Sequence, residues 1–332
     1  MKMLVTGGAG FIGSHVAEYL LQMGHSVVVL DDLSGGSLEN VPKGALFIQG
    51  DICDVKLVNK LFTEQKFSVV YHLAAYAAEG LSHFIRRYNY TNNLVGSVTL
   101  LNAAINTGVK RFVFTSSIAV YGKNQLPMSE DMVPSPEDPY GIAKLAVEQD
   151  LRAAFDMFGI EYVIFRPHNV YGEQQNIGDP YRNVVGIFMN NILHEQALPV
   201  FGDGTQTRAF SYIGDVAPII ARGGMESKAR NEVFNVGADQ PISVRDLAQE
   251  ISHAFGVECK LKFLPARHEV LHAFSSHEKV RNAFGETTST SLAQGIELMA
   301  HWVKKVGART SKSFEAIEVK HNLPPVWAER LK

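Results

Sequence analysis

The sequence of 332 residues is poor in cysteine, in uninterrupted apolar stretches and in runs of one charge. Its two cysteines, Cys53 and Cys259, are too few for a disulfide framework or a zinc site, which favours a reducing compartment and predicts no bound metal. No apolar stretch reaches the roughly 18 residues that span a bilayer, and no signal peptide precedes the first predicted strand. We therefore expect a cytoplasmic protein without membrane contact.

Neither sign of charge dominates the chain, because 31 lysines and arginines stand against 34 aspartates and glutamates, for a formal net charge of −3. Without a long basic run, a surface for nucleic acid is not expected, and any anionic ligand must be held by a few individual arginines. The hydrophobic content of 46% suits an ordinary globular protein, and the length allows one or two domains.

The most informative segment that is present lies near the N-terminus, where the apolar residues Met3–Val5 lead into the glycine-rich run Thr6–Gly13. This order predicts a strand, a tight turn and the start of a helix. Gly7, Gly10 and Gly13 would allow the turn, let backbone N–H groups approach a pyrophosphate, and let the helix pack close to the strand. Glycine-rich turns also make ordinary connections, so the pattern alone is weak evidence.

An acidic residue strengthens this interpretation, because Asp31 directly follows a second apolar run, Val27–Leu30, 18 residues after Gly13. A carboxylate at the end of the second strand can accept hydrogen bonds from both ribose hydroxyls of an adenosine, and it would repel a 2′-phosphate. The order of strand, turn, helix, second strand and acid therefore predicts a dinucleotide site for NAD rather than NADP.

Up to about residue 170, short β-branched runs alternate with amphipathic stretches, and this predicts an α/β fold with a doubly wound parallel sheet of the Rossmann type. The predicted strands are residues 2–6, 26–30, 45–49, 68–73, 111–116 and 161–166. The predicted helices are Ile12–Met23, Lys56–Gln65, Tyr88–Thr107 and Tyr140–Phe158.

The regular alternation ends near residue 175, where Gly, Asp, Pro and Asn become frequent, and this predicts a smaller C-terminal α/β substrate domain. We predict a dinucleotide-binding domain over residues 1–174 and the substrate domain over residues 175–332. A strand at Val233–Val236, within a segment near 211–240, would return to the first domain before a helix from Val244 to about Ala254.

A phenol and an ammonium group stand four residues apart at Tyr140 and Lys144, and therefore on one face of a predicted helix. A lysine cation lowers the pKa of a nearby phenol, which would give a base for use near neutral pH. The alternative is a surface tyrosine beside a solvated lysine. Ser117 follows the predicted strand at 111–116, and ligands of doubly wound sheets bind beyond the carboxyl ends of strands.

Together these elements resemble the extended short-chain dehydrogenase/reductase superfamily and, within it, the UDP-glucose 4-epimerase-like NAD-dependent epimerase/dehydratase family, over essentially the whole chain. Further matching segments are Gly50–Ile52, His72–Ala75, Asn92–Asn93, Arg166–Gly172 and Gly202–Arg208. The resemblance implies an NAD-dependent nucleotide-sugar 4-epimerase, acting on a UDP-hexose such as UDP-glucose, UDP-galactose, or an N-acetylated or uronic relative. It also implies that residues 175–332 mainly form the nucleotide-sugar-binding domain and that the protein is a homodimer.

The resemblance further implies roles for individual residues. Tyr140 would be the base, Lys144 its pKa partner and a ribose ligand, and Ser117 a hydrogen-bond donor to the reacting oxygen. The implied NAD contacts are Gly7, Gly10, Phe11, Ile12, Gly13, Asp31, Asp51, Ile52, Leu73, Ala74, Ala75, Asn92, Tyr140, Lys144 and His168. The implied substrate contacts are Ser117, Tyr140, Asn169, Pro199, Val200, Phe201, Arg208, Arg267 and Glu269.

The segment between Ala75 and Asn92 departs from the serine-rich pattern of these epimerases. Glu79, His83 and the pair Arg86–Arg87 could bind a substituted or acidic sugar, or the two arginines could be a solvated helix start. Related 4,6-dehydratases carry an acidic pair after the serine position, whereas this chain has Ile118–Ala119. Simple redox chemistry at C4 is therefore favoured.

Other functions remain open at this stage. A dehydrogenase, reductase or dehydratase of the same superfamily would use the same fold and the same three residues, but a dehydrogenase or reductase would exchange its cofactor with solvent, whereas an epimerase should retain NAD. A non-catalytic NAD-binding sensor is less favoured, because Ser117, Tyr140 and Lys144 are all present.

Overall fold

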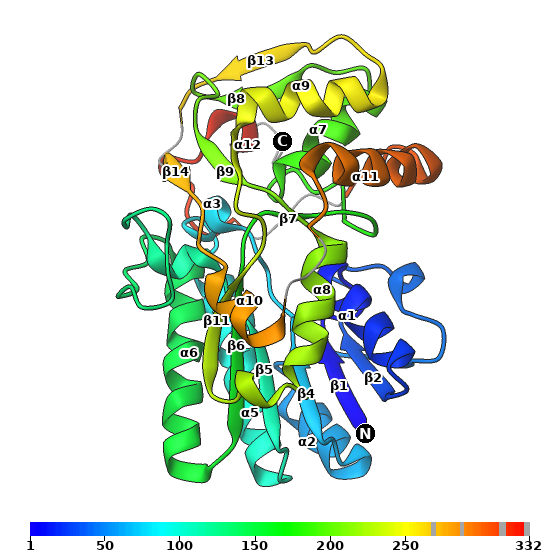
Figure 1. Ribbon diagram of the computed structural model, residues 1–332, viewed down its shortest axis with the longest axis vertical. Helices are drawn as coiled ribbons and strands as arrows, with labels where there is room; N and C mark the ends of the chain where they lie inside the picture. The colour runs from blue at the N-terminus through cyan, green and yellow to red at the C-terminus, as the bar shows by residue number, and fades with distance from the viewer. Residues whose placement is uncertain (267–269, 286–288, 312–316, 329–332) are drawn as a thin grey trace.

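The computed structural model describes residues 1–266, 270–285, 289–311 and 317–328, and a seven-stranded sheet runs through its lower half (Figure 1). The strand order is β3-β2-β1-β4-β5-β6-β11, and every neighbouring pair is parallel. These strands are β1 (Lys2–Thr6), β2 (Ser26–Asp31), β3 (Leu46–Gln49), β4 (Val69–His72), β5 (Arg111–Thr115), β6 (Glu161–Pro167) and β11 (Glu232–Val236). The predicted doubly wound Rossmann-type fold is confirmed.

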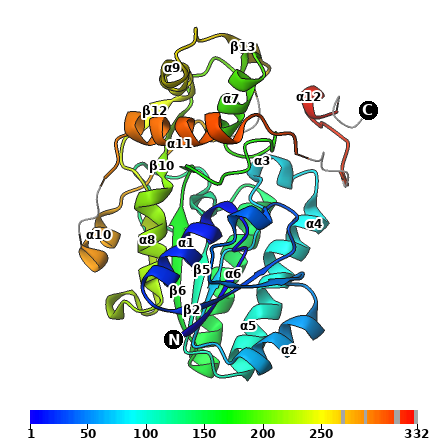
Figure 2. The same cartoon turned by 90° about the vertical axis from the view of Figure 1, so that its right-hand side faces the viewer.

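Helices cover both faces of the sheet, which explains why its strands are apolar along their whole length (Figures 1 and 2). Met3 and Val5 face one apolar cluster, and Leu4 between them faces the other. The first cluster includes residues of α1 (Phe11–Gln22), α8 (Ile213–Gly223) and α10 (Glu278–Phe284). The second includes residues of α2 (Val55–Gln65), α5 (Gly96–Asn106) and α6 (Pro139–Phe158).

The start of α6 is set by its own residues, and this start places Tyr140 in the first turn. Asp138 is the N-cap, and its carboxylate accepts a hydrogen bond of 3.0 Å from the Gly141 N–H. Pro139 stands at the first helical position, where its missing N–H costs nothing. The helix ends at Gly159, whose positive φ of 75° provides a left-handed cap.

The segment predicted to be helical over Tyr88–Thr107 is helical up to Asn106, but its middle is a π-helical turn and not regular α-helix. α4 (Arg86–Tyr90) passes through a π-helical turn, η2 (Thr91–Val95), before α5 begins. Inside this turn Asn93 donates a 2.8 Å hydrogen bond to Asn89 and accepts one of 2.9 Å from the Tyr76 N–H. These side-chain bonds tie the widened turn to the loop after β4. Such turns are frequent at functional sites.

A third apolar cluster lies above the sheet and is built by α7 (Val184–Leu193), α9 (Val244–Phe255) and α11 (Leu292–Val306) (Figure 1). Small sheets of two or three strands surround this upper apolar cluster. Their strands are β7 (Val170–Tyr171), β8 (Leu198–Phe201), β9 (Thr207–Ala209), β10 (Ser211–Tyr212), β12 (Pro241–Ser243), β13 (Leu261–Leu264) and β14 (His272–Ala273). The 3-10 turns are η1 (Leu38–Asn40), η3 (Ile118–Tyr121) and η4 (Ser227–Ala229).

Three later elements, α8, β11 and α10, return to the part of the molecule that contains the sheet. α8 and β11 pack against α1 and β6, and α10 then returns to β11, with Val280 and Phe284 buried in the cluster on the α1 face. The sequence contained no recognised signal for α10. The division into domains at residues 174 and 175 remains a prediction.

Residues 317–328, here called the C-terminal segment, fold onto the region around α3 (Glu79–Ser82) and α4. Glu318 accepts hydrogen bonds of 2.7 and 2.8 Å from the N–H groups of Arg87 and Tyr88. Trp327, in α12 (Pro325–Ala328), is only 3% exposed and packs edge-on against Phe84 and Tyr181. Distant parts of the sequence thus share one small apolar cluster.

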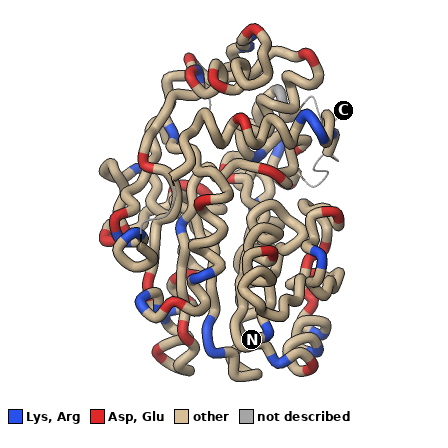
Figure 3. The backbone as a smooth tube through the Cα atoms, turned by 45° about the vertical axis from the view of Figure 1, so that its right-hand side comes forward, with Lys and Arg blue, Asp and Glu red and all other residues tan. Residues whose placement is uncertain are grey.

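Figure 3 shows basic and acidic residues interspersed over both parts of the molecule. In the described ranges, no helix combines the length and the apolar character that a membrane crossing needs.

Candidate active site

A cleft of about 1660 Å³ runs along the carboxyl ends of the sheet strands, between the sheet and the upper apolar cluster. This exceeds the roughly 300–1,000 Å³ that one small ligand usually occupies, so two nucleotide ligands can be accommodated. The predicted contact residues that line it are Gly7, Gly10, Phe11, Ile12, Gly13, Asp31, Asp51, Ile52, Leu73, Ala74, Ala75, Asn92, Ser117, Tyr140, Lys144, His168, Asn169, Pro199, Phe201 and Arg208. Their individual contacts remain predictions.

Three predicted substrate contacts stand apart from this set. The side chain of Val200 is fully buried in the upper apolar cluster, because neighbouring side chains of β8 alternate and only Pro199 and Phe201 face the cleft. A contact from Val200 to a ligand would therefore have to come from its backbone, and the expected contact remains a prediction. Arg267 and Glu269 lie outside the described residues.

The glycine-rich turn after β1 has the geometry that the sequence predicted. Gly7 has a φ of +71°, and a Cβ on it would lie 2.7 Å from the Ala74 nitrogen. A Cβ on Gly13 would lie 2.1 Å from the Gly7 carbonyl oxygen, so the helix can approach the strand only without a side chain there. Gly10 caps α1 without any side-chain hydrogen bond, which leaves the first N–H groups of the helix to an anion.

Asp31 stands at the end of β2 beside this turn, as expected. Its carboxylate oxygens accept hydrogen bonds from the Ala9 N–H at 3.0 Å and the Leu33 N–H at 2.8 Å. Burial raises the pKa of Asp31, and these backbone hydrogen bonds oppose the effect of burial. The two bonds hold the carboxylate at the edge of the cleft, where it can accept further hydrogen bonds.

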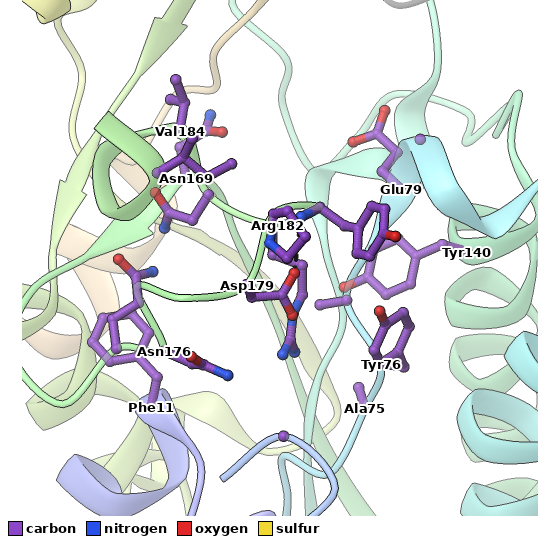
Figure 4. Close-up of a pocket in the computed structure, with 18 of the residues that line it drawn as sticks. Phe11, Ala75, Tyr76, Glu79, Tyr140, Asn169, Asn176, Asp179, Arg182 and Val184 are labelled. Carbon is purple, nitrogen blue, oxygen red and sulfur yellow. Dashed lines mark hydrogen bonds and ion pairs between the residues drawn. The ribbon is translucent and has the colours of Figure 1, made fainter. Parts of the chain in front are cut away.

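Ser117, Tyr140 and Lys144 come together at the far end of the cleft from Asp31. Ser117 follows β5, its side chain lies close enough to the Tyr140 hydroxyl to lower the pKa of Tyr140, and its oxygen accepts a 3.1 Å bond from the Ala119 N–H. The Lys144 ammonium lies 5.8 Å from the centre of the Tyr140 ring and donates a 2.7 Å hydrogen bond to the Thr115 carbonyl. Figure 4 shows Tyr140 facing the pocket.

The expected control of the Tyr140 pKa by Lys144 is not seen in this structure. Burial raises the pKa of Tyr140 above its ordinary value, the Ser117 side chain lowers it, and Asp138 and Glu79 raise it further. Burial also lowers the pKa of Lys144 to about 7, against the opposing charge of Glu148. The reason is desolvation, which penalises the charged forms of both groups and is the largest cause of both shifts.

Comparison with known proteins agrees with this geometry. A sequence model of the NAD dependent epimerase/dehydratase family matches residues 3–237. The UDP-glucose 4-epimerase of Mycolicibacterium smegmatis is 36% identical over 306 residues, which cover 89% of this chain and 96% of that protein. The chain belongs to the NAD dependent epimerase/dehydratase family. It is therefore an NAD-dependent enzyme.

Solved structures of similar proteins carry the same fold. The UDP-glucose 4-epimerase of Thermotoga maritima, solved with UDP-glucose, has a TM-score of 0.86 and 33% identity, with 92% of this chain and 99% of that chain covered. The UDP-glucose 4-epimerase of Thermus thermophilus, solved with NAD, has a TM-score of 0.86, 32% identity and the same coverage.

A relative with a different reaction is also similar in sequence. The UDP-N-acetyl-alpha-D-glucosaminuronate decarboxylase of Bacillus cytotoxicus is 30% identical over 325 residues, which cover 92% of this chain and 98% of that protein. Several reactions thus occur among similar proteins.

The residues of this epimerase/dehydratase family member fit NAD. The bare N-terminus of α1 and the side-chain-free space at Gly7 and Gly13 suit a pyrophosphate, and Asp31 suits a ribose. Tyr140 and Lys144 suit the nicotinamide end, since both line the cleft and Lys144 bonds to Thr115 at the end of β5, which β1 and β4 separate from β2 and Asp31. Within the described ranges, no group of three or more His, Cys, Asp or Glu residues is placed to hold a metal ion.

A buried ion pair beneath the three catalytic candidates was not foreseen. Arg166, from β6, is 1% exposed and donates hydrogen bonds of 2.9 and 2.5 Å to the two carboxylate oxygens of Glu148, which is fully buried. Ser116 donates a 2.5 Å bond to the same carboxylate. A signal existed, because Tyr140, Lys144 and Glu148 recur every four residues along α6 and so share one face.

His168, an expected NAD contact, has both ring nitrogens engaged. Its Nδ1 lies 2.9 Å from the Ala209 carbonyl, which can only accept, and its Nε2 lies 3.0 Å from Nε2 of His277. Nδ1 of His277 is 2.6 Å from Asp239. Burial lowers the pKa of His168 to about 3. Only the ring face and the backbone of His168 are therefore left to contact a cofactor.

On the side expected to bind the nucleotide sugar, Arg208 and Asn169 both donate hydrogen bonds to backbone carbonyls. Arg208 donates hydrogen bonds to the carbonyls of Thr207 and Leu271, both at 2.9 Å, and Asn169 donates a 3.3 Å bond to the Ala209 carbonyl. Both residues line the cleft. Their guanidinium and amide groups suit a diphosphate, and that contact stays a prediction.

The unusual segment after Ala75 divides into two parts. Glu79 and His83 line the cleft, whereas Arg86 and Arg87 are exposed at the start of α4 and do not line it. The alternative of a solvated helix start therefore describes the two arginines, whereas Tyr88, which follows them, lines the cleft together with the first part of the segment.

The unusual pKa of Lys144 predicts a pH dependence of stability. In protein freed of nucleotide, the folded state binds fewer protons than the unfolded chain between pH 7 and the ordinary lysine value of 10.5. The free energy of unfolding should therefore rise with pH across this window, by at most about 1.4 kcal/mol per pH unit, and the Lys144→Met variant should lack this rise. Urea unfolding of both proteins at several pH values measures the difference. Parallel curves for the two proteins would contradict the lowered pKa.

Proposed function

We propose that the protein is a nucleotide-sugar 4-epimerase that acts on a UDP-hexose through a 4-keto intermediate. The meeting of Ser117, Tyr140 and Lys144 at one end of a cleft with room for two nucleotides carries this proposal. The similar proteins that are named UDP-glucose 4-epimerase support it. A neutral hexose, an N-acetylated hexosamine and a uronate remain the candidate sugars.

Each of the three residues has a defined part in such a reaction. Tyr140 takes the proton of the C4 hydroxyl, and Ser117 holds the same oxygen through a hydrogen bond. Bound NAD would accept the C4 hydride and return it to the opposite face of the sugar. Lys144 holds the nicotinamide ribose, and its charge favours the phenolate when it is protonated. Tyr140 finally gives its proton back to the C4 oxygen.

The surroundings of Ser117 favour simple redox chemistry over elimination. Ile118 follows Ser117 and packs in an apolar cluster with Val120, Met128 and Ala273, so no acid or base from this turn reaches the sugar. Asp138 and Glu79 are cleft-lining carboxylates whose charges raise the pKa of Tyr140, and Asp138 also accepts the Gly141 N–H bond as the N-cap of α6. A dehydratase would therefore have to use Glu79 or Asp138, and this remains the alternative reaction.

Proton NMR of the purified enzyme without added cofactor tests the proposal. The enzyme is incubated separately with UDP-glucose, UDP-N-acetylglucosamine and UDP-glucuronate, and the anomeric signal of the 4-epimer is expected with at least one of them. Formation or consumption of NADH without epimer would indicate a dehydrogenase or reductase, and a 4-keto-6-deoxy product would indicate a dehydratase. Either result would overturn the proposal.

The proposal includes a cytoplasmic homodimer. The absence of a disulfide framework and the family resemblance support these two statements. Light scattering on the purified protein measures the number of subunits.

A further inference from the structure

Arg182 reaches across the cleft from the upper part of the molecule to the loops of the sheet. It lies in the loop between β7 and α7, and its guanidinium carbon is 5.0 Å from the centre of the Tyr76 ring, in the loop after β4. Its Nη2 lies 3.3 Å from the point where a Cβ on Gly35, in the loop after β2, would stand. One side chain therefore approaches both loops that flank the glycine-rich turn.

The guanidinium lies midway along the expected path of a dinucleotide. Asp31, at the ribose end, precedes Gly35 by four residues, and Tyr140 lies at the nicotinamide end. Burial raises the pKa of Tyr88 and of Tyr140, and the charge of Arg182 opposes burial at both. Figure 4 shows Arg182 and Asp179 in the middle of the pocket, between Phe11 on one side and Tyr140 on the other.

Asp179 fixes the side chain of Arg182 in this position. The Nε of Arg182 donates a 2.7 Å hydrogen bond to one oxygen of Asp179, and the other oxygen accepts a 2.9 Å bond from the Tyr181 N–H. Among the residues that the structure describes, none accepts a hydrogen bond from either Nη group of Arg182. The pair of Nη groups is thus oriented in advance and available to a phosphate, which a guanidinium fork binds with two parallel hydrogen bonds.

The rest of the dinucleotide site supplies little positive charge. Among the cleft-lining residues up to position 170, Lys144 is the only lysine or arginine. It stands at the nicotinamide end and points to the Thr115 carbonyl. A pyrophosphate over the glycine-rich turn would therefore meet backbone N–H groups on one side, and a cation is needed from elsewhere to match its charge.

We propose that Arg182 binds the pyrophosphate of NAD from the side opposite the glycine-rich turn. The cofactor is then held between the sheet and the upper part of the chain, and it leaves only when the β7–α7 loop moves. This inference deepens the proposed epimerase function and rests on it in one respect, which is the use of slow cofactor release. An epimerase regenerates its cofactor in each turnover and benefits from slow release, whereas an enzyme that exchanges its cofactor with solvent does not.

Direct binding measurements on nucleotide-free protein test this role. Calorimetric titrations of the wild type and of Arg182→Gln are carried out with NAD, ADP, adenosine and UDP. The variant should bind NAD and ADP about 10- to 100-fold more weakly, because a charge-assisted hydrogen bond to phosphate is lost, and should bind adenosine and UDP as the wild type does. It should also purify with less NAD. Arg86→Gln, at an exposed position outside the cleft, is the matched control and should change nothing.

Three outcomes would overturn the assignment. Unchanged affinity of Arg182→Gln for NAD would show that the guanidinium does not contact the cofactor. An equal loss of affinity for adenosine in Arg182→Gln would mean that the variant distorts the whole site. In that case Arg182→Lys, which keeps the positive charge, would not recover part of the NAD affinity, whereas the proposal expects that it does. A loss for UDP alone would place Arg182 at the substrate diphosphate. None of these titrations needs turnover, so a protein without epimerase activity would refute the proposed function and leave the Arg182 result standing.

Discussion

The Tyr140→Phe variant should epimerise its substrate about 10²–10⁴-fold more slowly than the wild type, while still binding NAD and nucleotide sugar. The substitution removes only the hydroxyl that takes the C4 proton. The ring itself is 7% exposed and stays packed at the start of α6, so the fold should not change. Initial rates by NMR, together with NAD content and circular dichroism of the purified variant, measure the three expectations.

Tyr90→Phe is the matched control for this experiment. Tyr90 ends α4, does not line the cleft, and makes no hydrogen bond through its hydroxyl with the residues that the structure describes. Its rate should equal that of the wild type. If Tyr140→Phe instead keeps the full rate, another group takes the proton, and Glu79 and Asp138 become the first candidates because both line the cleft and their charges act on Tyr140.

The largest loss of stability is expected from Glu148→Ala. The variant leaves the Arg166 guanidinium, which is 1% exposed, without the carboxylate that accepts two of its hydrogen bonds. Removing one partner of a buried ion pair costs about 3–5 kcal/mol of the free energy of unfolding, because the remaining charge stays out of water. Denaturant unfolding followed by fluorescence measures this loss.

A double variant separates the buried charge from the lost packing. Glu148→Ala with Arg166→Met removes both charges, and its free energy of unfolding should recover much of the loss. Glu64→Ala, which breaks the exposed pair between Lys60 and Glu64, should cost under about 1 kcal/mol. A single Glu148→Ala variant as stable as Glu64→Ala would show that solvent or another group compensates Arg166.

The sheet and its dinucleotide cradle could be predicted because their signals are local. Each strand is a short apolar run between turns, and the turn after β1 needs glycine at Gly7 and Gly13 for steric reasons that any backbone of this shape imposes. The pair Tyr140 and Lys144 could also be found, since a spacing of four residues on a helix fixes their common face. The burial of the Val200 side chain between Pro199 and Phe201 follows from the alternation of β8, which is equally local.

The remaining parts of the site depend on contacts between residues far apart in the chain. Arg182 faces Gly35 and Tyr76, and Arg166 faces Glu148, only because the topology places β6 beside α6 and the β7–α7 loop above β2 and β4. The π-helical turn η2 likewise depends on Asn93 bonding to the backbone of Tyr76. No period or composition of the sequence reports such pairs, so they could not be predicted from it.

The packing of the C-terminal segment sets an order of assembly during synthesis. Leu81 and Ile85 are fully buried, and their cluster includes Trp327. At about 5–20 residues per second, a ribosome needs roughly 10–50 s to proceed from Phe84 to Trp327. For that interval the nascent chain carries an uncovered apolar surface, and in its last part, after β11 has been made, this surface lies next to a sheet whose strands are all available. This region is therefore where a chaperone would bind during translation, and the wall of the active site is completed only after the sheet that supports it.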